Sequence, residues 1–112
     1  MRTRDHHGDT FFVSTQDQHI GRAVFVNGHF DAPTVALALR LIAAHGITIT
    51  KVLDIGANIG TTTIEALTLL RDATAESFEP EPANYRLLQR NIAANGLNGR
   101  VTTHRLALSD TD

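Results

Sequence analysis

The order in which the hydrophobic period changes along the chain constrains the fold more than any other feature of the sequence. The expected elements are, in order, a strand at 47–55, a helix at 59–70, a strand at 75–79, a helix that Pro82 opens and Asn95-Gly96 ends, and a strand at 100–106. Parallel strands joined by helices take right-handed crossovers. We therefore predict an α/β fold, the first half of a doubly wound sheet, with the three strands in the spatial order third, second, first.

The first predicted strand is rich in β-branched residues and ends in an apolar run, which is typical of a strand buried on both faces. A doubly wound sheet needs helices on both faces, and its first strand needs a neighbour on each side. The sequence up to Asp112 supplies only half of these elements. We expect the front half of a larger domain, with the first strand as an open edge that allows self-association.

Two regions are predicted. Residues 1–46 form an N-terminal extension with short strands and a helix at 34–45, and residues 47–112 form the first half of the α/β domain. Asp31 and Thr34 are both suitable N-caps for the helix in the extension. That helix is apolar on nearly every side, so we expect it to be buried on more than one face.

Two further packing expectations concern the first ten residues and the last predicted helix. The polar residues 1–10 are expected to fray. In the last helix, Tyr85, Leu88 and Ile92 are spaced as a core stripe, whereas Arg86 and Arg90 are expected on a solvated face.

Composition excludes several classes of function. The 112 residues carry a formal charge of −2, which does not favour nucleic acid or an anionic membrane as a partner. Cysteine is absent, so disulfides and thiolate chemistry are excluded. No apolar run approaches the roughly 20 residues of a membrane span, and the N-terminus lacks the apolar segment of a secretory signal, so the cytoplasm is expected. The scattered histidines do not match a metal site; they include His6, His7, His19 and His29.

The segment with the clearest chemistry is the glycine loop at Asp54–Gly60, between the first strand and the first helix. Gly56 permits a sharp turn and a close approach of a ligand to the backbone, and Asn58 tolerates a left-handed conformation. The first amides of the following helix lack helical acceptors and carry the positive end of its dipole. Such a loop is suited to a polar or anionic group.

The spacing of the loop decides between ligand classes. A P-loop needs a lysine after its last glycine, but the only lysine is Lys51, ahead of the loop. The dinucleotide pattern needs glycines at the positions of Asn58 and Thr61. The pattern acidic-x-Gly-x-(Gly/Asn)-x-Gly fits Asp54 and the residues after it, and is the first motif of Rossmann-like methyltransferases that use S-adenosylmethionine.

A second acidic residue supports this interpretation. Glu79 ends the second predicted strand about 20 residues beyond the loop, where a carboxylate can accept both ribose hydroxyls of a nucleoside. Pro80 follows and can pack against the base. Loop, helix, strand and terminal acid in this order are more specific than the loop alone.

From about Val52 onward the sequence resembles the FkbM-type methyltransferases. The matching segments are LDIGANIG at 53–60, FEPEPANYRLLQRNIAANGL at 78–97 and ALSD at 107–110. NGHFD at 27–31 matches more loosely. The resemblance implies a Rossmann-like domain that transfers a methyl group from S-adenosylmethionine, often to a hydroxyl oxygen, so that a small molecule or glycan would be the acceptor.

The resemblance also implies roles for individual residues. Asp54 would support the loop near the methionine amine, and Glu79 would hold the ribose. The residues expected to surround the methionine portion or donate to its carboxylate are Gly56, Ala57, Asn58, Gly60, Thr61 and Thr63. Backbone groups near Ala107 and Leu108 would border the adenine, and Asp31 is an alternative contact from the extension.

Two other functions remain open at this point. One is a half-domain that binds a nicotinamide dinucleotide, and the other is a non-catalytic fragment. The sequence indicates no catalytic base and no acceptor site. We expect weak methyl transfer, or none, from this chain alone.

Overall fold

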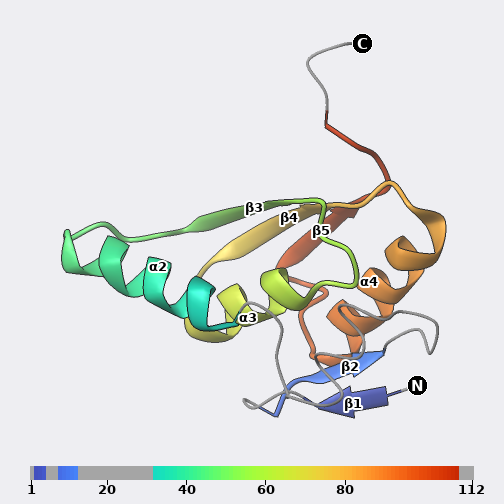
Figure 1. The fold of residues 1–112 in the computed structure, drawn as a ribbon, viewed down its shortest axis with the longest axis horizontal. Helices are drawn as coiled ribbons and strands as arrows, with labels where there is room; N and C mark the ends of the chain where they lie inside the picture. Colours follow the sequence, from blue (N-terminus) through green and yellow to red (C-terminus); the bar gives the residue numbers. More distant parts are fainter. Residues whose placement is uncertain (1, 5–7, 13–31, 109–112) are drawn as a thin grey trace.

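The computed structural model describes residues 2–4, 8–12 and 32–108. Two sheets are present, and Figure 1 shows the larger one covered by helices along one side. The elements are β1 (Arg2–Arg4), β2 (Thr10–Phe12), α2 (Ala32–Ala44), β3 (Lys51–Ile55), α3 (Thr61–Leu69), β4 (Thr74–Phe78), α4 (Pro82–Ala94) and β5 (Val101–His104).

The larger sheet has the order β3-β4-β5 with both pairs parallel, which confirms the predicted βαβαβ topology. The register aligns Ile55 with Phe78 and Phe78 with His104. The carboxyl ends of the three strands therefore meet at one edge, where the loop after β3 and the acidic end of β4 are also placed.

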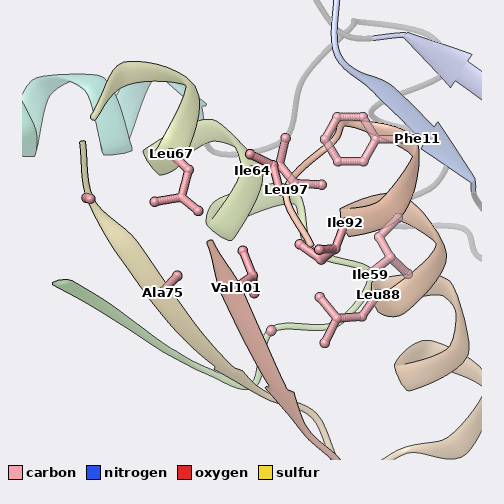
Figure 2. Packing of buried hydrophobic residues seen from close by; sticks show 11 residues of the cluster. Phe11, Ile59, Ile64, Leu67, Ala75, Leu88, Ile92, Leu97 and Val101 are labelled. Atoms are coloured by element: carbon pink, nitrogen blue, oxygen red, sulfur yellow. The ribbon is translucent and has the colours of Figure 1, made fainter. Parts of the chain in front are cut away.

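The core lies between this sheet and helices α3 and α4 (Figure 2). Ile64 and Leu67 point inward from α3, and Leu88 and Ile92 point inward from α4, each almost fully buried. The predicted core stripe of α4 is confirmed, with Tyr85 partly buried at its edge. Burial of an aliphatic side chain contributes about 1.5–3 kcal/mol, so this layer stabilises the packing of both helices on the sheet.

The prediction that the first strand is buried on both faces is wrong. Leu53 and Ile55 are 60% and 61% exposed, because the described helices pack against only the opposite face of β3. The strand also begins at Lys51 rather than at Ile47. Among the described residues β3 is an edge strand, as expected.

Helix α2 is less buried than its composition predicts. It packs along α3, and both Leu37 and Leu41 are more than half exposed. The expectation of burial on several faces is therefore wrong, because in the described part of the chain α3 is the main helix that α2 contacts. Thr34 lies inside the helix and is not its cap, while Asp31 falls outside the described residues.

The described residues near the start of the chain, 2–4 and 8–12, belong to the fold and are not frayed. β1 and β2 pair antiparallel, and Phe11 is 1% exposed within the core. The Asn95 carboxamide accepts from the Thr10 amide at 2.8 Å and donates to the Thr10 carbonyl at 2.7 Å. In addition to its pairing with β1, β2 thus has a backbone amide and a carbonyl hydrogen-bonded to the side chain of Asn95. His6, His7, His19, His29 and the NGHFD segment at 27–31 lie outside the described residues.

One arginine of α4 also departs from the prediction. The Arg90 guanidinium lies 4.0 Å from the centroid of the Phe12 ring. A cation over an aromatic face is attracted to it. Arg90 therefore helps to dock β2 and does not belong to a purely solvated face.

The ends of the helices follow local rules. Gly96 takes the left-handed conformation (φ 69°) that ends α4, and Leu97 packs into the core, both as predicted. Glu81 caps the start of α4 by accepting from the amides of Ala83 and Asn84. None of the helices in the described part of the chain combines the length and the hydrophobicity of a membrane span.

Candidate functional site

The loop after β3 folds through three left-handed residues in five positions. Gly56, Asn58 and Gly60 have φ angles of 72°, 54° and 98°. Asn58 is the only residue other than glycine with positive φ in the described part of the chain. These conformations explain why the spacing of glycine and asparagine, rather than glycine content alone, characterises the loop.

The loop is tied to the end of the neighbouring strand by its own amides. Gly56 and Ala57 both donate to the Phe78 carbonyl at 2.9 Å, and Gly60 donates to the Ala57 carbonyl at 2.9 Å. These amides are therefore used within the protein. A contact of these residues with a methionine portion would therefore not use these amide hydrogens, and their placement around it stays a prediction.

Glu79 faces the loop and is 5% exposed. Its Oε1 accepts from the Asn58 amide at 2.8 Å, and its Oε2 accepts from the Glu81 amide at 3.0 Å. The Glu79 amide donates to the His104 carbonyl at 3.0 Å, which fixes the backbone beneath the carboxylate. The structure therefore brings Glu79 and Asn58 together, but the Asn58 amide binds Glu79 rather than standing free for a ligand.

Asp54 supports the start of α3. The Thr63 hydroxyl donates to Asp54 Oδ2 at 2.6 Å and lies 2.7 Å from the Ser77 hydroxyl. Burial raises the pKa of Asp54, and the neighbouring Glu79 charge raises it further, against the lowering effect of hydrogen bonds from Thr63. Asp54 is therefore held by the first turn of α3, and its expected place near a methionine amine stays a prediction.

The two threonines expected to contact a ligand are buried. Thr63 is fully buried and its hydroxyl is engaged with Asp54, so its observed role is to support the carboxylate. Thr61 is also buried and forms the first residue of α3. Ser77, which the sequence analysis did not single out, completes this hydroxyl network from β4.

The remaining predicted residues lie farther from the buried part of the site. Pro80 is exposed directly after Glu79. Ala107 and Leu108 are exposed, and residues 105–108 lead away from the sheet (Figure 1). The structure does not bring these two residues onto the loop, so their placement beside an adenine stays a prediction.

Asn84 is a site residue that the sequence analysis missed. From the first turn of α4, its Nδ2 donates to Asn58 Oδ1 at 2.9 Å. The preceding Glu81 was also missed, although an acidic residue directly before a proline at a helix start is a recognisable N-cap signal. No comparable local signal marks Asn84, because its contact joins residues 26 positions apart.

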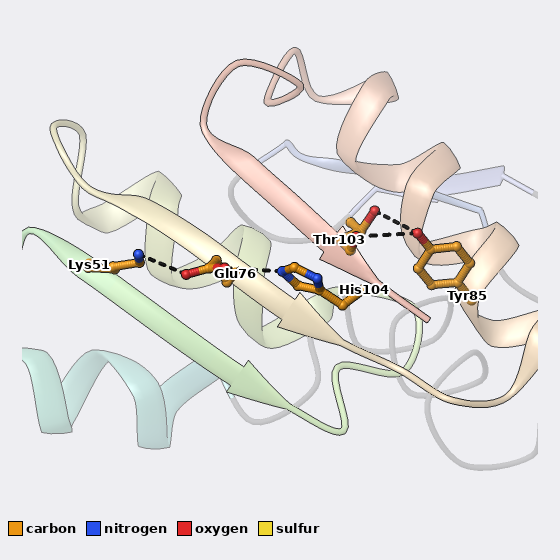
Figure 3. Close-up of polar contacts among 5 residues, drawn as sticks. All are labelled: Lys51, Glu76, Tyr85, Thr103 and His104. Atoms are coloured by element: carbon orange, nitrogen blue, oxygen red, sulfur yellow. Dashed lines mark hydrogen bonds and ion pairs between the residues drawn. The ribbon is translucent and has the colours of Figure 1, made fainter. Parts of the chain in front are cut away.

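A second polar cluster lies on the open face of the sheet, away from the helices (Figure 3). Glu76 pairs with Lys51 at 2.7 Å and with His104 at 3.1 Å, and the His104 ring stacks on Phe78 with centroids 4.6 Å apart. Hydrogen bonds from Lys51 and His104 lower the pKa of Glu76. On the helix side, the Tyr85 hydroxyl lies 3.1 Å from that of Thr103. Among the described residues no group of His, Asp and Glu is arranged to hold a metal.

Comparisons with known proteins define the fold. No family model and no curated protein matches the sequence. Among solved structures, the complex of aTrm5 with tRNALeu is similar at a TM-score of 0.69 and 15% identity, over 100% of this chain and 29% of that one. The protein yhhF of Escherichia coli, provisionally described as a methyltransferase, matches at a TM-score of 0.63 and 18% identity. The match covers 96% of this chain and 53% of that one.

A third similar structure contains a bound ligand. TYW2 of P. horikoshii, solved in complex with MeSAdo, matches at a TM-score of 0.50 and 22% identity, over 58% of this chain and 24% of that one. The chain thus spans between about a quarter and about half of the length of these three proteins. The described residues have the fold of part of a Rossmann-like methyltransferase domain.

Proposed function

We propose that this chain supplies the cofactor-binding part of a methyltransferase that uses S-adenosylmethionine. The observation that carries the proposal is the Glu79 carboxylate, held at the carboxyl end of β4 against the left-handed loop that follows β3. Ligands of open α/β sheets bind outside the carboxyl ends of the strands. The fold shared with methyltransferases supports the same class.

The residues present fit this cofactor. A carboxylate offers about four lone-pair sites. Glu79 uses two of them on backbone amides, so two remain for a pair of ribose hydroxyls. A Cβ built on Gly56 would meet nothing within 4 Å, so a ligand can approach the backbone there. The amides that open a helix lack helical acceptors and suit a carboxylate, but that of Thr63 already binds Asp54, so Thr61 and Thr62 are the proposed donors.

When bound, the cofactor supplies a methyl group on a positively charged sulfur. Asp54 and Glu79 place two carboxylates on this side of the sheet, and their negative charge favours a cation by Coulomb attraction. What remains for the protein is mainly alignment with an acceptor. The resemblance to FkbM-type enzymes supports a hydroxyl acceptor on a small molecule or a glycan.

The proposal is tested by measuring the binding of S-adenosylhomocysteine with calorimetry and with thermal shift, and by comparing it with the binding of NAD. Glu79→Gln removes the negative charge of the side chain. The side-chain nitrogen of the new glutamine cannot accept a hydrogen bond from the backbone amide of Glu81. We expect at least tenfold weaker binding. Glu76→Gln, a matched change on the open face, should bind as the parent chain does. Binding of NAD in preference to S-adenosylhomocysteine would overturn the proposal.

Turnover is a separate expectation. Within the described residues we assign no side chain to acceptor binding or deprotonation, so binding is expected without efficient methyl transfer. The measurement is transfer of a labelled methyl group to a panel of hydroxylated small molecules and glycans. Efficient transfer by the 112-residue chain would contradict this expectation.

A further inference from the structure

Three residues of α4 contact three consecutive residues of the loop after β3, which is called the ligand loop from here on and comprises residues 56–60. Asn84, Leu88 and Asn91 are spaced i, i+4 and i+7, so they lie on one face of the helix. The loop residues that they meet are Asn58, Ile59 and Gly60. Because the loop emerges from β3, these contacts join two segments that are distant in the sequence.

The polar contacts lie at the two ends of this face. Asn84 Nδ2 donates to Asn58 Oδ1 at 2.9 Å, and Asn91 Nδ2 donates to the Ile59 carbonyl at 2.7 Å. Asn58 is the loop residue whose backbone amide also binds Glu79. Asn84 therefore holds the side chain of the residue whose amide orients the Glu79 carboxylate.

The middle contact is steric. A Cβ added to Gly60 would come within 3.0 Å of Leu88 Cδ1, and the φ of 98° disfavours any other residue there. Leu88 is fully buried. The loop backbone thus rests on Leu88 between the two asparagine contacts.

Asn91 extends the arrangement to the start of the chain. Its side chain is fully buried, donates to the Phe12 carbonyl at 3.1 Å and accepts from the Phe12 amide. One carboxamide therefore joins β2 to the carbonyl of Ile59. The N-terminal strand thereby belongs to the support of the ligand loop.

We propose that Asn84, Leu88 and Asn91 form a clamp on α4 that fixes residues 58–60 in the conformation that orients Glu79, and that Asn84 acts through Asn58. Asn84 is a positioning residue in this scheme, not a ligand contact. The clamp goes beyond the proposed function because it describes the loop without a ligand, while its effect on affinity rests on that function.

The test uses Asn84→Ala, because Asn84 is half-buried whereas loss of the fully buried Asn91 endangers the fold. Loss of one neutral hydrogen bond is expected to accelerate exchange of the Asn58 amide about three- to tenfold without ligand, and to weaken S-adenosylhomocysteine binding by a similar factor. The Leu97 amide, which donates to Ile92 at the far end of α4, should exchange unchanged.

A double-mutant cycle identifies the route of the effect. Asn58→Gly keeps the left-handed backbone but already lacks the bond to Asn84, so Asn84→Ala should add nothing in that background. Gln89→Ala, an exposed change on the same helix, is the control and should alter neither measurement. Unchanged Asn58 exchange in Asn84→Ala, or an equal effect in the Asn58→Gly background, would overturn the clamp.

Failure of the proposed function gives a different result. If the parent chain does not bind S-adenosylhomocysteine, the proposed function falls, and the exchange measurements alone decide whether the clamp exists.

Discussion

At the scale of single residues, the site depends on a buried chain of hydrogen bonds from Ser77 through Thr63 to Asp54. Thr63 is central because its one hydroxyl meets both neighbours within 2.7 Å. A carboxylate can only accept, so with Asp54 ionised Thr63 donates to it and Ser77 donates to Thr63. The orientation of Asp54 thus depends on a residue of the following helix and one of the adjacent strand.

Thr63→Val keeps the shape of the side chain and removes both hydrogen bonds. Because Asp54 and Ser77 would each lose a buried partner, we expect a loss of about 1–3 kcal/mol in the free energy of unfolding. Urea denaturation measures this change. Thr62→Val, at the half-buried neighbouring position, should cost clearly less, and equal losses for the two variants would argue against the network.

The raised pKa of Asp54 gives a pH dependence of defined sign. Its folded pKa lies above its unfolded value, so its stabilising contribution is complete below the unfolded pKa and is lost as the pH rises through the folded pKa. Asp54→Asn does not titrate. The difference in melting temperature, variant minus parent, should therefore be more positive at pH 7 than at pH 4.

This comparison cancels the titration of Glu76 and Glu81, because both residues are present in both proteins. Hydrogen bonds lower the pKa of each of these two, so their stabilising contributions are lost as the pH falls through their folded pKa values. Melting curves of both proteins between pH 4 and pH 7 give the difference directly. A difference that does not change with pH would contradict a raised pKa.

At the scale of elements, the carbonyl end of α3 is closed by a residue of the β5 region. Arg100 donates from Nε to the Ala73 carbonyl at 3.0 Å, and from Nη2 to the carbonyls of Leu70 at 2.6 Å and Leu67 at 3.3 Å. A cation at this end of a helix also opposes the negative end of its dipole. The residue directly before β5 thus stabilises the helix that follows the loop at 56–60.

Arg100→Lys tests this contact. Lysine keeps the charge but cannot reproduce the planar fork that reaches several carbonyls at once. We expect a loss of about 1–2 kcal/mol in the free energy of unfolding, measured by chemical denaturation. The matched change Arg105→Lys, at an exposed position just beyond β5, should have little effect, and similar losses would show that the fork does not matter.

The limits of prediction from the sequence follow from the same contacts. The parallel sheet and the position of Glu79 follow from periodicity and spacing, because each strand and helix has its own local pattern and the right-handed crossover rule then determines how the strands pair. Asn84 and Arg100 were not foreseen, because their partners lie 26 to 33 positions away and ordinary helix or strand positions give no local sign of them. The burial of Phe11 likewise depends on where α4 lies.

At the scale of the whole molecule, the described sheet has one covered face and one open face. On β3 the open face shows Leu53 and Ile55, and the same strand is the sheet edge. An exposed apolar edge strand is a template for pairing with another chain. We therefore propose that two copies of the chain associate through β3.

Leu53→Lys tests this association. Leu53 is 60% exposed, so a lysine there should not disturb the core, but its charge opposes pairing along the edge. We expect the parent chain to show a mass above that of a monomer by light scattering at about 100 μM, and the variant to shift toward the monomer. Leu37→Lys, at a similarly exposed apolar position on α2, should have the same mass in solution as the parent chain. A monomeric parent chain, or an equal shift in both variants, would show that β3 is not the contact, because only a contact at the sheet edge distinguishes the two positions.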